Sequence, residues 1–367
     1  MRNIVIVGAG FTGTTLAVQL AQKGNSKIYL IEKMPEHFFT GPAYKEQSIY
    51  HSLNVRAKDM GAIDSKPDDF FHWLTKHYPK VYGPMDFVPR KIYGEYLKCL
   101  IEPYLNSSIK VIQDEIIDLV NNEAVGKKEN YQYDTIFLCL GGNYLTPTLS
   151  QLDPMLIKIK GAGLSAIDLI VDQVKNGYQG KFELYSRRGL MPLIHDHSEG
   201  SFHGPKKLLE YFQEIKHISQ TQNATQYVVN ELRPKLKEIW ESFTNKEKSQ
   251  FYRYLKPYWE IFRHRMTPDQ FQILQELKVQ NRLKIIKINK NSDMQFDVDC
   301  SGFQPPKAEL IKNLCTKGYV MFDQYGIGFT SKHPQIKTIG PMEKYYKFEI
   351  SAVREIRREV ANLVQSF

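Results

Sequence analysis

Residues 3–13 read NIVIVGAGFTG, and this stretch decides the fold. The small, branched apolar residues over 3–7 predict a strand buried on both faces. The strand ends in the pattern G-x-G-x-x-G, formed by Gly8, Gly10 and Gly13, and apolar residues at helical spacing follow it. We therefore expect a strand, a tight turn and a helix whose N-terminus binds the pyrophosphate of a dinucleotide.

The glycines of this first fingerprint, residues 8–13, have separate physical roles. Gly8 allows the tight turn, Gly10 lets the backbone approach a pyrophosphate, and Gly13 lets the helix pack close to the strand. A second strand is predicted over 27–31 and closes with Glu32, at roughly the ~20-residue spacing expected for a carboxylate that binds a ribose hydroxyl. The candidate residues are Gly8, Gly10, Phe11, Thr12, Gly13, Glu32 and Lys33. This pattern alone leaves open a nicotinamide dinucleotide or FAD.

A second copy of the pattern lies at residues 156–166, which read LIKIKGAGLSA. The sequence G-x-G-x-x-A is the looser form of the same fingerprint. The next predicted strand, 182–186, is followed by arginines that suit the 2′-phosphate of NADP, or that form an ordinary basic surface pair. The candidate residues of this second fingerprint are Gly161, Gly163, Ser165, Arg187 and Arg188. Lys158 and Lys160 alternate with isoleucine, which is unusual for a strand buried on both faces and could weaken nicotinamide binding.

Two fingerprints in one chain favour a particular pair of cofactors. FAD held permanently and a visiting NADPH (or NADH) form the pair that needs two dinucleotide sites, because the nicotinamide supplies the hydride and the flavin carries the chemistry.

The remaining elements follow from periodicity and from turn residues. Residues 33–66 are irregular, and a long loop of this kind is usually functional. The sequence predicts a capped helix over 68–74, a helix over 93–100, strands over 111–119, 134–140, 283–286 and 296–300, a helical insertion over about 196–280, and a last helix over about 347–365. Gly141 ends the buried strand 134–140, and Gly340 precedes the last helix, so both glycines are candidates for close approach to a ligand.

Composition limits the function classes. The chain has 367 residues, 42% of them hydrophobic and 24% charged, so two domains of an ordinary globular protein are expected. The net charge is +9, but no lysine and arginine block is dense enough to favour nucleic acid. No apolar run approaches the ~18 residues that span a membrane. The four cysteines form no C-x-x-C pair, which favours a reducing compartment, and we expect the protein in the cytoplasm. No metal site is expected.

The sequence resembles the FAD/NAD(P)-binding family that includes FAD-dependent urate hydroxylase and aspartate N-monooxygenase. The motifs that carry the resemblance are both fingerprints, Ala43-Tyr44, Leu53-Asn54-Val55, Asp68-Asp69-Phe70, Val88-Pro89-Arg90, Ser186-Arg187-Arg188-Gly189-Leu190, Trp259 with Arg263-His264-Arg265-Met266, and Gly340-Pro341. The resemblance implies FAD on the first fingerprint, with Asn54 and Val55 among its contacts, and NAD(P)H on the second.

The resemblance also changes the interpretation of Arg263, His264 and Arg265. By spacing alone, residues 258–266 form the packed face of a helix with a solvated charged side. Because the resemblance places this cluster at a position that recurs in the family, it implies instead that the cluster contacts an anion, either the substrate or a cofactor phosphate.

The expected fold is α/β, with two Rossmann-like dinucleotide-binding domains, the second inserted in the first. Residues 1–150 and 300–367 form the predicted FAD-binding domain, and 151–299 the NAD(P)-binding domain with its helical insertion. The leading functional hypothesis is an FAD-dependent, NAD(P)H-using monooxygenase that hydroxylates a small polar or anionic molecule. The alternatives are a flavin reductase or dehydrogenase that passes electrons to a partner, and a non-catalytic FAD-binding module. No catalytic side chain and no oligomeric state are assigned.

Overall fold

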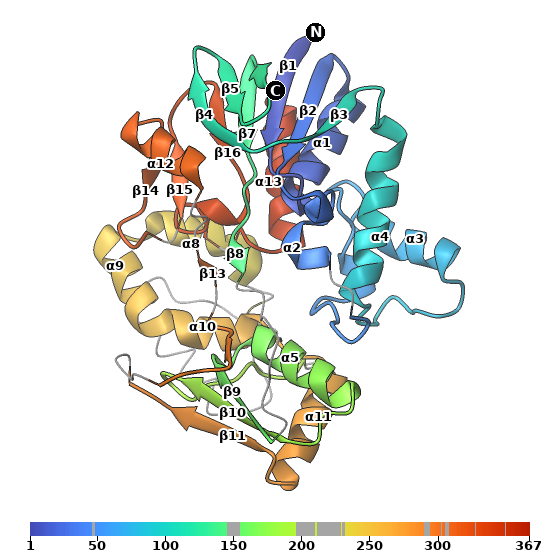
Figure 1. Cartoon of the computed structure of the whole chain (residues 1–367), viewed down its shortest axis with the longest axis vertical. Coiled ribbons are helices and arrows are strands. Elements are labelled where there is room, and N and C mark those ends of the chain that lie inside the picture. Colours follow the sequence, from blue (N-terminus) through green and yellow to red (C-terminus); the bar gives the residue numbers. More distant parts are fainter. Residues whose placement is uncertain are drawn as a thin grey trace. The chain divides into compact units, whose positions relative to one another are not determined.

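The structure, a computed structural model, describes residues 1–45, 48–144, 155–195, 210, 229, 232–289, 294–301, 303–304, 308–326, 328–348 and 350–367. The chain divides into two compact units: unit 1 comprises Met1–Tyr144 and Phe303–Phe367, and unit 2 comprises Leu145–Gly302. Unit 2 is therefore inserted in the sequence of unit 1 (Figure 1). Most of the first part of the predicted helical insertion, residues 196–209 and 211–228, lies outside the described residues.

Unit 1 is built on a five-stranded sheet in the order β16-β7-β1-β2-β3. Its strands are β1 (Arg2–Val7), β2 (Ser26–Glu32), β3 (Ile109–Gln113), β7 (Thr135–Leu138) and β16 (Ile336–Thr338). All four pairings are parallel. The strand order reverses at β1, with β2 and β3 on one side and β7 and β16 on the other. Such a reversal is the place where open parallel sheets bind their ligands.

Both faces of this sheet are buried, as the apolar β1 sequence predicts. Ile4 and Ile6 pack in one core with residues of α1 (Phe11–Lys23), α4 (Arg90–Ile101) and α13 (Val353–Gln365). Val5 and Val7 pack in a second core on the other face. That core includes residues of the antiparallel strands β4 (Ile116–Val120), β5 (Glu123–Gly126) and β6 (Asn130–Gln132) and of α12 (Glu309–Thr316).

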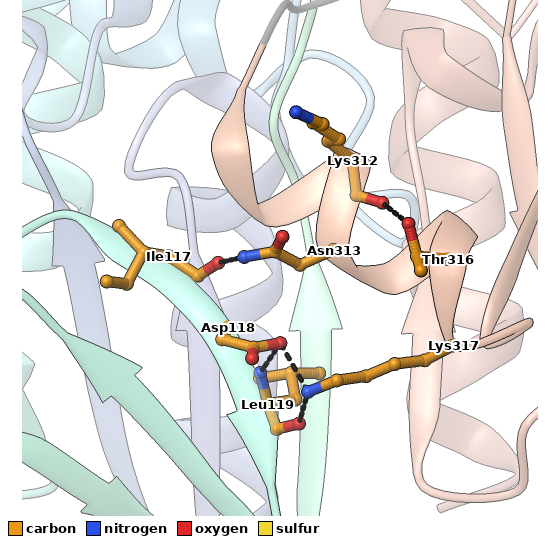
Figure 2. A network of polar contacts seen from close by, with 7 residues as sticks. All are labelled: Ile117, Asp118, Leu119, Lys312, Asn313, Thr316 and Lys317. Atoms are coloured by element: carbon orange, nitrogen blue, oxygen red, sulfur yellow. Dashed lines mark hydrogen bonds and ion pairs between the residues drawn. The ribbon is translucent and has the colours of Figure 1, made fainter.

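Helix α12 joins the C-terminal part of unit 1 to its N-terminal part (Figure 2). The side-chain amide of Asn313 donates to the carbonyl of Ile117 at 2.8 Å. Lys317 Nζ lies 2.7 Å from Asp118 Oδ1 and donates to the carbonyl of Leu119 at 2.9 Å. These contacts attach α12, which follows unit 2 in the sequence, to strand β4, which precedes unit 2.

The single strand predicted over 111–119 is wrong, because the chain turns sharply inside it. Strand β3 ends at Gln113 and β4 begins at Ile116 in a different sheet. Buried Asp114 makes this turn: its carboxylate accepts the backbone N–H groups of Glu115 and Lys128 and the hydroxyl of Tyr131. These contacts across the turn replace the ladder that one long strand would need.

Two predicted helices also differ in detail. Helix α3 (Asp69–His77) is present, but the side chain of Asp68 does not cap it and lies instead 3.7 Å from His72 Nδ1. The last helix begins at Val353, later than predicted. Apart from short 3₁₀ turns, the other described elements of unit 1 are α2 (Gly41–Tyr44), β8 (Asn143–Tyr144), β13 (Phe303–Gln304), β14 (Val320–Phe322) and β15 (Phe329–Ser331).

Unit 2 repeats the same strand order on a smaller scale. Its parallel sheet runs β11-β10-β9-β12, formed by β9 (Leu156–Lys160), β10 (Lys181–Ser186), β11 (Leu283–Lys287) and β12 (Val298–Asp299). Helices α5 (Leu164–Lys175) and α11 (Pro268–Val279) connect its strands and contact each other. The remaining described helices are a 3₁₀ turn (Arg233–Lys235), α8 (Leu236–Ser242), α9 (Asn245–Gln250), the π-helix Phe251–Leu255 and α10 (Lys256–Arg263).

Helix α11 belongs to the sheet layer, because it leads into β11 and contacts it. The last helix within the range predicted for the insertion therefore packs with the sheet of unit 2.

The lysines of β9 have a local explanation. Ile157 and Ile159 are fully buried, while Lys158 and Lys160 are half-buried on the opposite face. Lys160 Nζ pairs with Asp299 Oδ2 at 2.9 Å on the neighbouring strand β12. An ion pair between adjacent strands supports a half-buried face, so the alternation is compatible with a central strand.

Candidate functional site

The first fingerprint lies at the carboxyl end of β1, where the strand order reverses. Gly8 has φ +101°, and a Cβ added to it would lie 2.4 Å from the carbonyl oxygen of Cys139. Its N–H donates to Ile31 at 2.8 Å, and the N–H of Cys139 donates to Val7 at 2.8 Å. The turn is therefore wedged between the ends of β2 and β7, and only glycine fits at residue 8.

The other two glycines of the first fingerprint serve close backbone packing. A Cβ on Gly13 would lie 1.9 Å from the carbonyl oxygen of Gly8, so α1 packs directly on the turn. A Cβ on Gly10 would lie 3.3 Å from Cα of Gly41, which itself has φ +58°. Sequence reasoning did not select Gly41 as a site residue, although the Gly-Pro-Ala-Tyr stretch at 41–44 was a visible signal.

The carboxylate of Glu32 closes the turn from the end of β2. Its Oε2 accepts the N–H of Ala9 at 3.1 Å, and its Oε1 accepts the N–H of Met34 at 3.2 Å. Each oxygen has a second lone pair that a ribose hydroxyl could use. Lys33 is exposed, and its Nζ lies 3.6 Å from Glu115 Oε1.

Gly340 brings the C-terminal segment to the same place. It has φ +96°, and a Cβ added to it would lie 2.9 Å from Thr12 Oγ1 in the first turn of α1. The last helix does not follow Gly340 directly, as the sequence predicted. A short 3₁₀ turn, Pro341–Glu343, comes first, and the helix begins at Val353. Gly141 follows β7 with φ +63°, and no described atom lies within 4 Å of the place of its Cβ.

Asn54 and Val55 lie in an irregular stretch that is paired with the residues before α4. The N–H of Leu53 donates to Val88 at 2.8 Å, and the N–H of Ala57 donates to Asp86 at 3.0 Å. Val55 packs against the same core as Phe11. The structure thus links these two motifs of the sequence through backbone hydrogen bonds.

Arg357 of α13 fastens the loop that follows this stretch. It is 6% exposed, its Nη1 donates to the carbonyls of Gly61 at 2.7 Å and Asp59 at 3.2 Å, and its Nε lies 3.6 Å from Asp64 Oδ1. We expect Arg357→Met to lower the free energy of unfolding by about 2–4 kcal/mol, because it leaves buried carbonyls unpaired. Urea denaturation measures this loss. Exposed Arg358→Met is the matched control and should change stability by less than about 0.5 kcal/mol.

The second fingerprint repeats the contacts of the first glycine of the first fingerprint. Gly161 has φ +108°, and its Cβ would lie 2.5 Å from the carbonyl oxygen of Cys300. Its N–H donates to Tyr185 at 2.8 Å, and the N–H of Cys300 donates to Lys160 at 2.7 Å. Gly163 and Ser165 are exposed at the start of α5, and no described atom lies within 4 Å of the place of a Cβ on Gly163.

The predicted arginine pair after β10 separates into two different environments. Arg188 donates to the carbonyls of Tyr254 at 3.0 Å and Arg253 at 2.9 Å, and its guanidinium lies 5.6 Å from the ring centroid of Tyr258. Arg187 is exposed, and no hydrogen bond or ion pair joins it to the part of the chain that the structure describes. Arg187 is therefore the member of the pair that is available to a phosphate.

We expect Arg188→Ala to destabilise unit 2 by about 1–3 kcal/mol, because it removes two charge-assisted hydrogen bonds to the π-helix and the contact with the ring of Tyr258. Thermal unfolding of the variant measures the effect. Arg187→Ala in the same assay should unfold like the parent protein, and an equal loss in both variants would contradict the division of roles.

The prediction of a solvated charged side over 258–266 is wrong for its arginines. Arg263 and Arg265 are 8% and 2% exposed. Arg265 donates from Nε to Phe262 at 2.9 Å and from Nη1 to Ile194 at 2.8 Å, so it has a structural role. His264 Nε2 lies 3.0 Å from Glu260 Oε2.

The backbone joins this cluster to the chain that follows Arg187 and Arg188. The N–H of Met266 donates to Leu193 at 2.8 Å, and the N–H of His195 donates to Met266 at 3.0 Å. Two motifs of the resemblance are therefore one packed assembly within unit 2.

The part of the chain that carries the first fingerprint is similar to a known sequence family. Residues 5–143 match the FAD-NAD(P)-binding family. The residues present fit such a dinucleotide, because two glycines leave the backbone of the turn bare, Glu32 keeps lone pairs available, and the first N–H groups of a helix have no intrahelical partner. A comparison with curated proteins found no match.

Solved structures resemble the whole chain. An ornithine N-hydroxylase of Kutzneria sp. 744, solved with reduced FAD, NADP⁺ and L-ornithine, is 12% identical over 100% of this chain and 99% of that chain, with a TM-score of 0.61. L-lysine 6-monooxygenase of Pseudomonas syringae has the same values. Bacillithiol disulfide reductase of Staphylococcus aureus is 12% identical over 100% of this chain and 98% of that chain, with a TM-score of 0.58. At these identities the likeness shows the fold, an α/β protein with Rossmann-like domains. Across the described ranges, no helix is long and apolar enough to cross a membrane.

Proposed function

We propose that this chain is an FAD-dependent oxidoreductase that uses NAD(P)H. The observation that carries the proposal is the repeated turn: Gly8 against the carbonyl of Cys139 and Gly161 against the carbonyl of Cys300. One chain has built the same dinucleotide-binding turn twice, each at the reversal point of a parallel sheet. Unit 1 is the proposed FAD site and unit 2 the proposed nicotinamide site, with Arg187 favouring NADPH.

When bound, FAD would supply the redox chemistry, with NAD(P)H as the reductant and O₂ or another molecule as the acceptor. The chain's own residues have simpler tasks. The bare turn and the N-terminus of α1 bind the pyrophosphate, Glu32 holds the ribose, and Gly340 with Thr12 closes the site from the C-terminal side. The Lys160–Asp299 pair on the half-buried face of β9 supports an intact nicotinamide site in unit 2.

Within this class we propose a monooxygenase that hydroxylates a small polar or anionic substrate. The resemblance of the sequence motifs to the family that includes FAD-dependent urate hydroxylase and aspartate N-monooxygenase supports the proposal, although the solved structures compared above point to no urate hydroxylase. Two of the compared structures are named as enzymes that act on ornithine and lysine. Amino acids with a free amine are therefore the first substrates to test.

A reductase without oxygenation is the second candidate, since a disulfide reductase shares the fold. The cysteines do not favour disulfide chemistry within the chain. Cys139 and Cys300 are buried at the ends of strands in separate sheets, and burial raises the pKa of the Cys300 thiol to about 12. A thiol of this kind carries almost no thiolate at neutral pH. The four free cysteines also support our placement of the protein in the cytoplasm.

The test is a visible spectrum of the purified protein, recorded before and after NADPH is added under argon and again after air is admitted. A yellow protein that bleaches and regains its colour in air supports the proposal, and amine-dependent NADPH oxidation supports the monooxygenase. Bleaching that only an added electron acceptor reverses favours the reductase. A yellow protein that ignores both NADPH and NADH favours a non-catalytic module. A protein that remains colourless after incubation with FAD contradicts the assignment of the first fingerprint.

A further inference from the structure

A buried carboxylate follows the turn at Gly340. Glu343 ends the 3₁₀ turn Pro341–Glu343 and its side chain is only 4% exposed. Its N–H donates to the carbonyl of Gly340 at 2.9 Å, so it belongs to the same turn that contacts Thr12 of the first fingerprint. The charge of Glu343 also helps to raise the pKa of the buried thiol of Cys139, after burial itself, which places Glu343 near the end of β7.

The two carboxylate oxygens of Glu343 contact different groups. Oε1 accepts the hydroxyls of Thr338 at 2.7 Å and Thr330 at 3.3 Å, while Oε2 lies 2.7 Å from Lys347 Nζ. These contacts favour the ionised carboxylate. Burial acts against them and is the larger influence, so that the pKa of Glu343 is raised above that of an ordinary glutamate.

Lys347 does not neutralise Glu343 alone, because it also pairs with Glu359 of α13. The cluster therefore consists of two carboxylates and one ammonium group, with a net charge of −1 when all are ionised. Lys347 is 37% exposed and Glu359 25% exposed, so water can exchange protons with the buried carboxylate through this side of the cluster.

We propose that Glu343 takes up a proton from solvent when FAD bound at the first fingerprint is reduced. The inference rests on the proposed function. Two electrons delivered to FAD add negative charge to a cofactor bound at the first fingerprint, and Thr12 of that fingerprint meets the turn that carries Glu343. The cluster of Glu343, Lys347 and Glu359 already has one more carboxylate than it has cations. The O–H bond forms on the Glu343 carboxylate, and the bound proton offsets part of the added charge. Glu343 then makes the reduction potential of bound FAD depend on pH, without itself taking part in the reaction.

Reduction of FAD and protonation of Glu343 favour each other. Added negative charge raises the proton affinity of the carboxylate, so the proton is taken up in the pH window between the pKa of Glu343 with oxidised FAD and its higher pKa with reduced FAD. Within that window, one further proton enters for every two electrons. The reduction potential of bound FAD then falls by about 30 mV more per pH unit than it does without this group.

The experiment is an electrochemical titration of the FAD-loaded protein with mediators from pH 5 to pH 9, which needs neither NAD(P)H nor substrate. We expect the wild-type protein to show the steeper window and Glu343→Gln to lose it. Lys347→Gln retains the carboxylate but removes its cation, so its window should move to higher pH. Thermal unfolding of each variant without FAD reports structural damage separately.

Identical pH slopes in wild type and Glu343→Gln would overturn the inference while leaving FAD binding intact. If Glu343→Gln does not fold, an unshifted window in Lys347→Gln overturns it equally. Wild-type protein that binds no FAD would contradict the proposed function itself and this inference with it.

Discussion

Replacing Gly13 by alanine is expected to abolish FAD binding and to lower the free energy of unfolding by roughly 3–5 kcal/mol. The added Cβ would lie 1.9 Å from the carbonyl oxygen of Gly8 and 3.3 Å from Cγ2 of Ile6. The first of these is a backbone atom that cannot rotate away, so α1 must move off β1. That movement opens the core around Ile4 and displaces the N–H groups of the helix that are proposed to bind the pyrophosphate.

The measurements are the FAD content after reconstitution and the midpoint of urea unfolding. Gly83→Ala is the control in the same unit, because its Cβ would meet the nearest atom, Asp86 Oδ2, at an ordinary 3.5 Å. It should keep both FAD and stability. If Gly13→Ala binds FAD with the same affinity as the Gly83→Ala control, helix α1 can shift without loss of FAD binding, and the prediction is wrong.

The second fingerprint shows why this glycine could be recognised from sequence. Its equivalent position is Ala166, which is fully buried, so the second turn accommodates the methyl group that the first excludes. Local patterns of this kind, a strand that ends in a glycine turn and leads into a helix, depend on neighbours in sequence. They predicted β1, α1, β2, β9, α5 and β10 because each element is specified by its own residues.

Contacts between distant segments were beyond prediction. Nothing local to Gly10 announces that Gly41 lies against it, and nothing local to Arg188 names the carbonyls of Arg253 and Tyr254 as its partners. The turn at Asp114 was missed for the same reason, since Lys128 and Tyr131 arrive from a later hairpin. An alternating apolar pattern through 111–119 fits one strand as well as two, and only these later residues decide between them.

The buried arginines after α10 make the same point for the site. A charged residue at helical spacing is normally solvated, which is why Arg263 and Arg265 were expected on a surface. Arg265 is instead buried because two backbone carbonyls, those of Phe262 and Ile194, take its N–H groups. The contacts that Arg265 makes are to the protein. The anion contact that the resemblance implies for this cluster stays a prediction for Arg263 and His264.

Replacing Arg187 by alanine is expected to lower the affinity for NADPH about 10- to 100-fold and the affinity for NADH by less than about threefold. A charge-assisted hydrogen bond from arginine to phosphate contributes about 1.5–3 kcal/mol, and each 1.4 kcal/mol is a tenfold change in affinity. Arg187 follows β10 at the place where this fold binds the 2′-phosphate, and it is exposed. Since NADH lacks that phosphate, the loss should fall on NADPH alone.

The affinity of each nicotinamide cofactor, measured as KM and as Kd for the oxidised form, tests this prediction. Arg187→Lys should recover part of the NADPH affinity, because it restores the charge but cannot bind the phosphate through two parallel N–H groups. Arg188→Ala separates the alternatives: its effect should track the loss of unit 2 stability and weaken both cofactors to a similar degree, since its N–H groups are bound to the π-helix. If Arg187→Ala weakens NADH as much as NADPH, Arg187 does not read the 2′-phosphate, and the preference for NADPH must come from another residue.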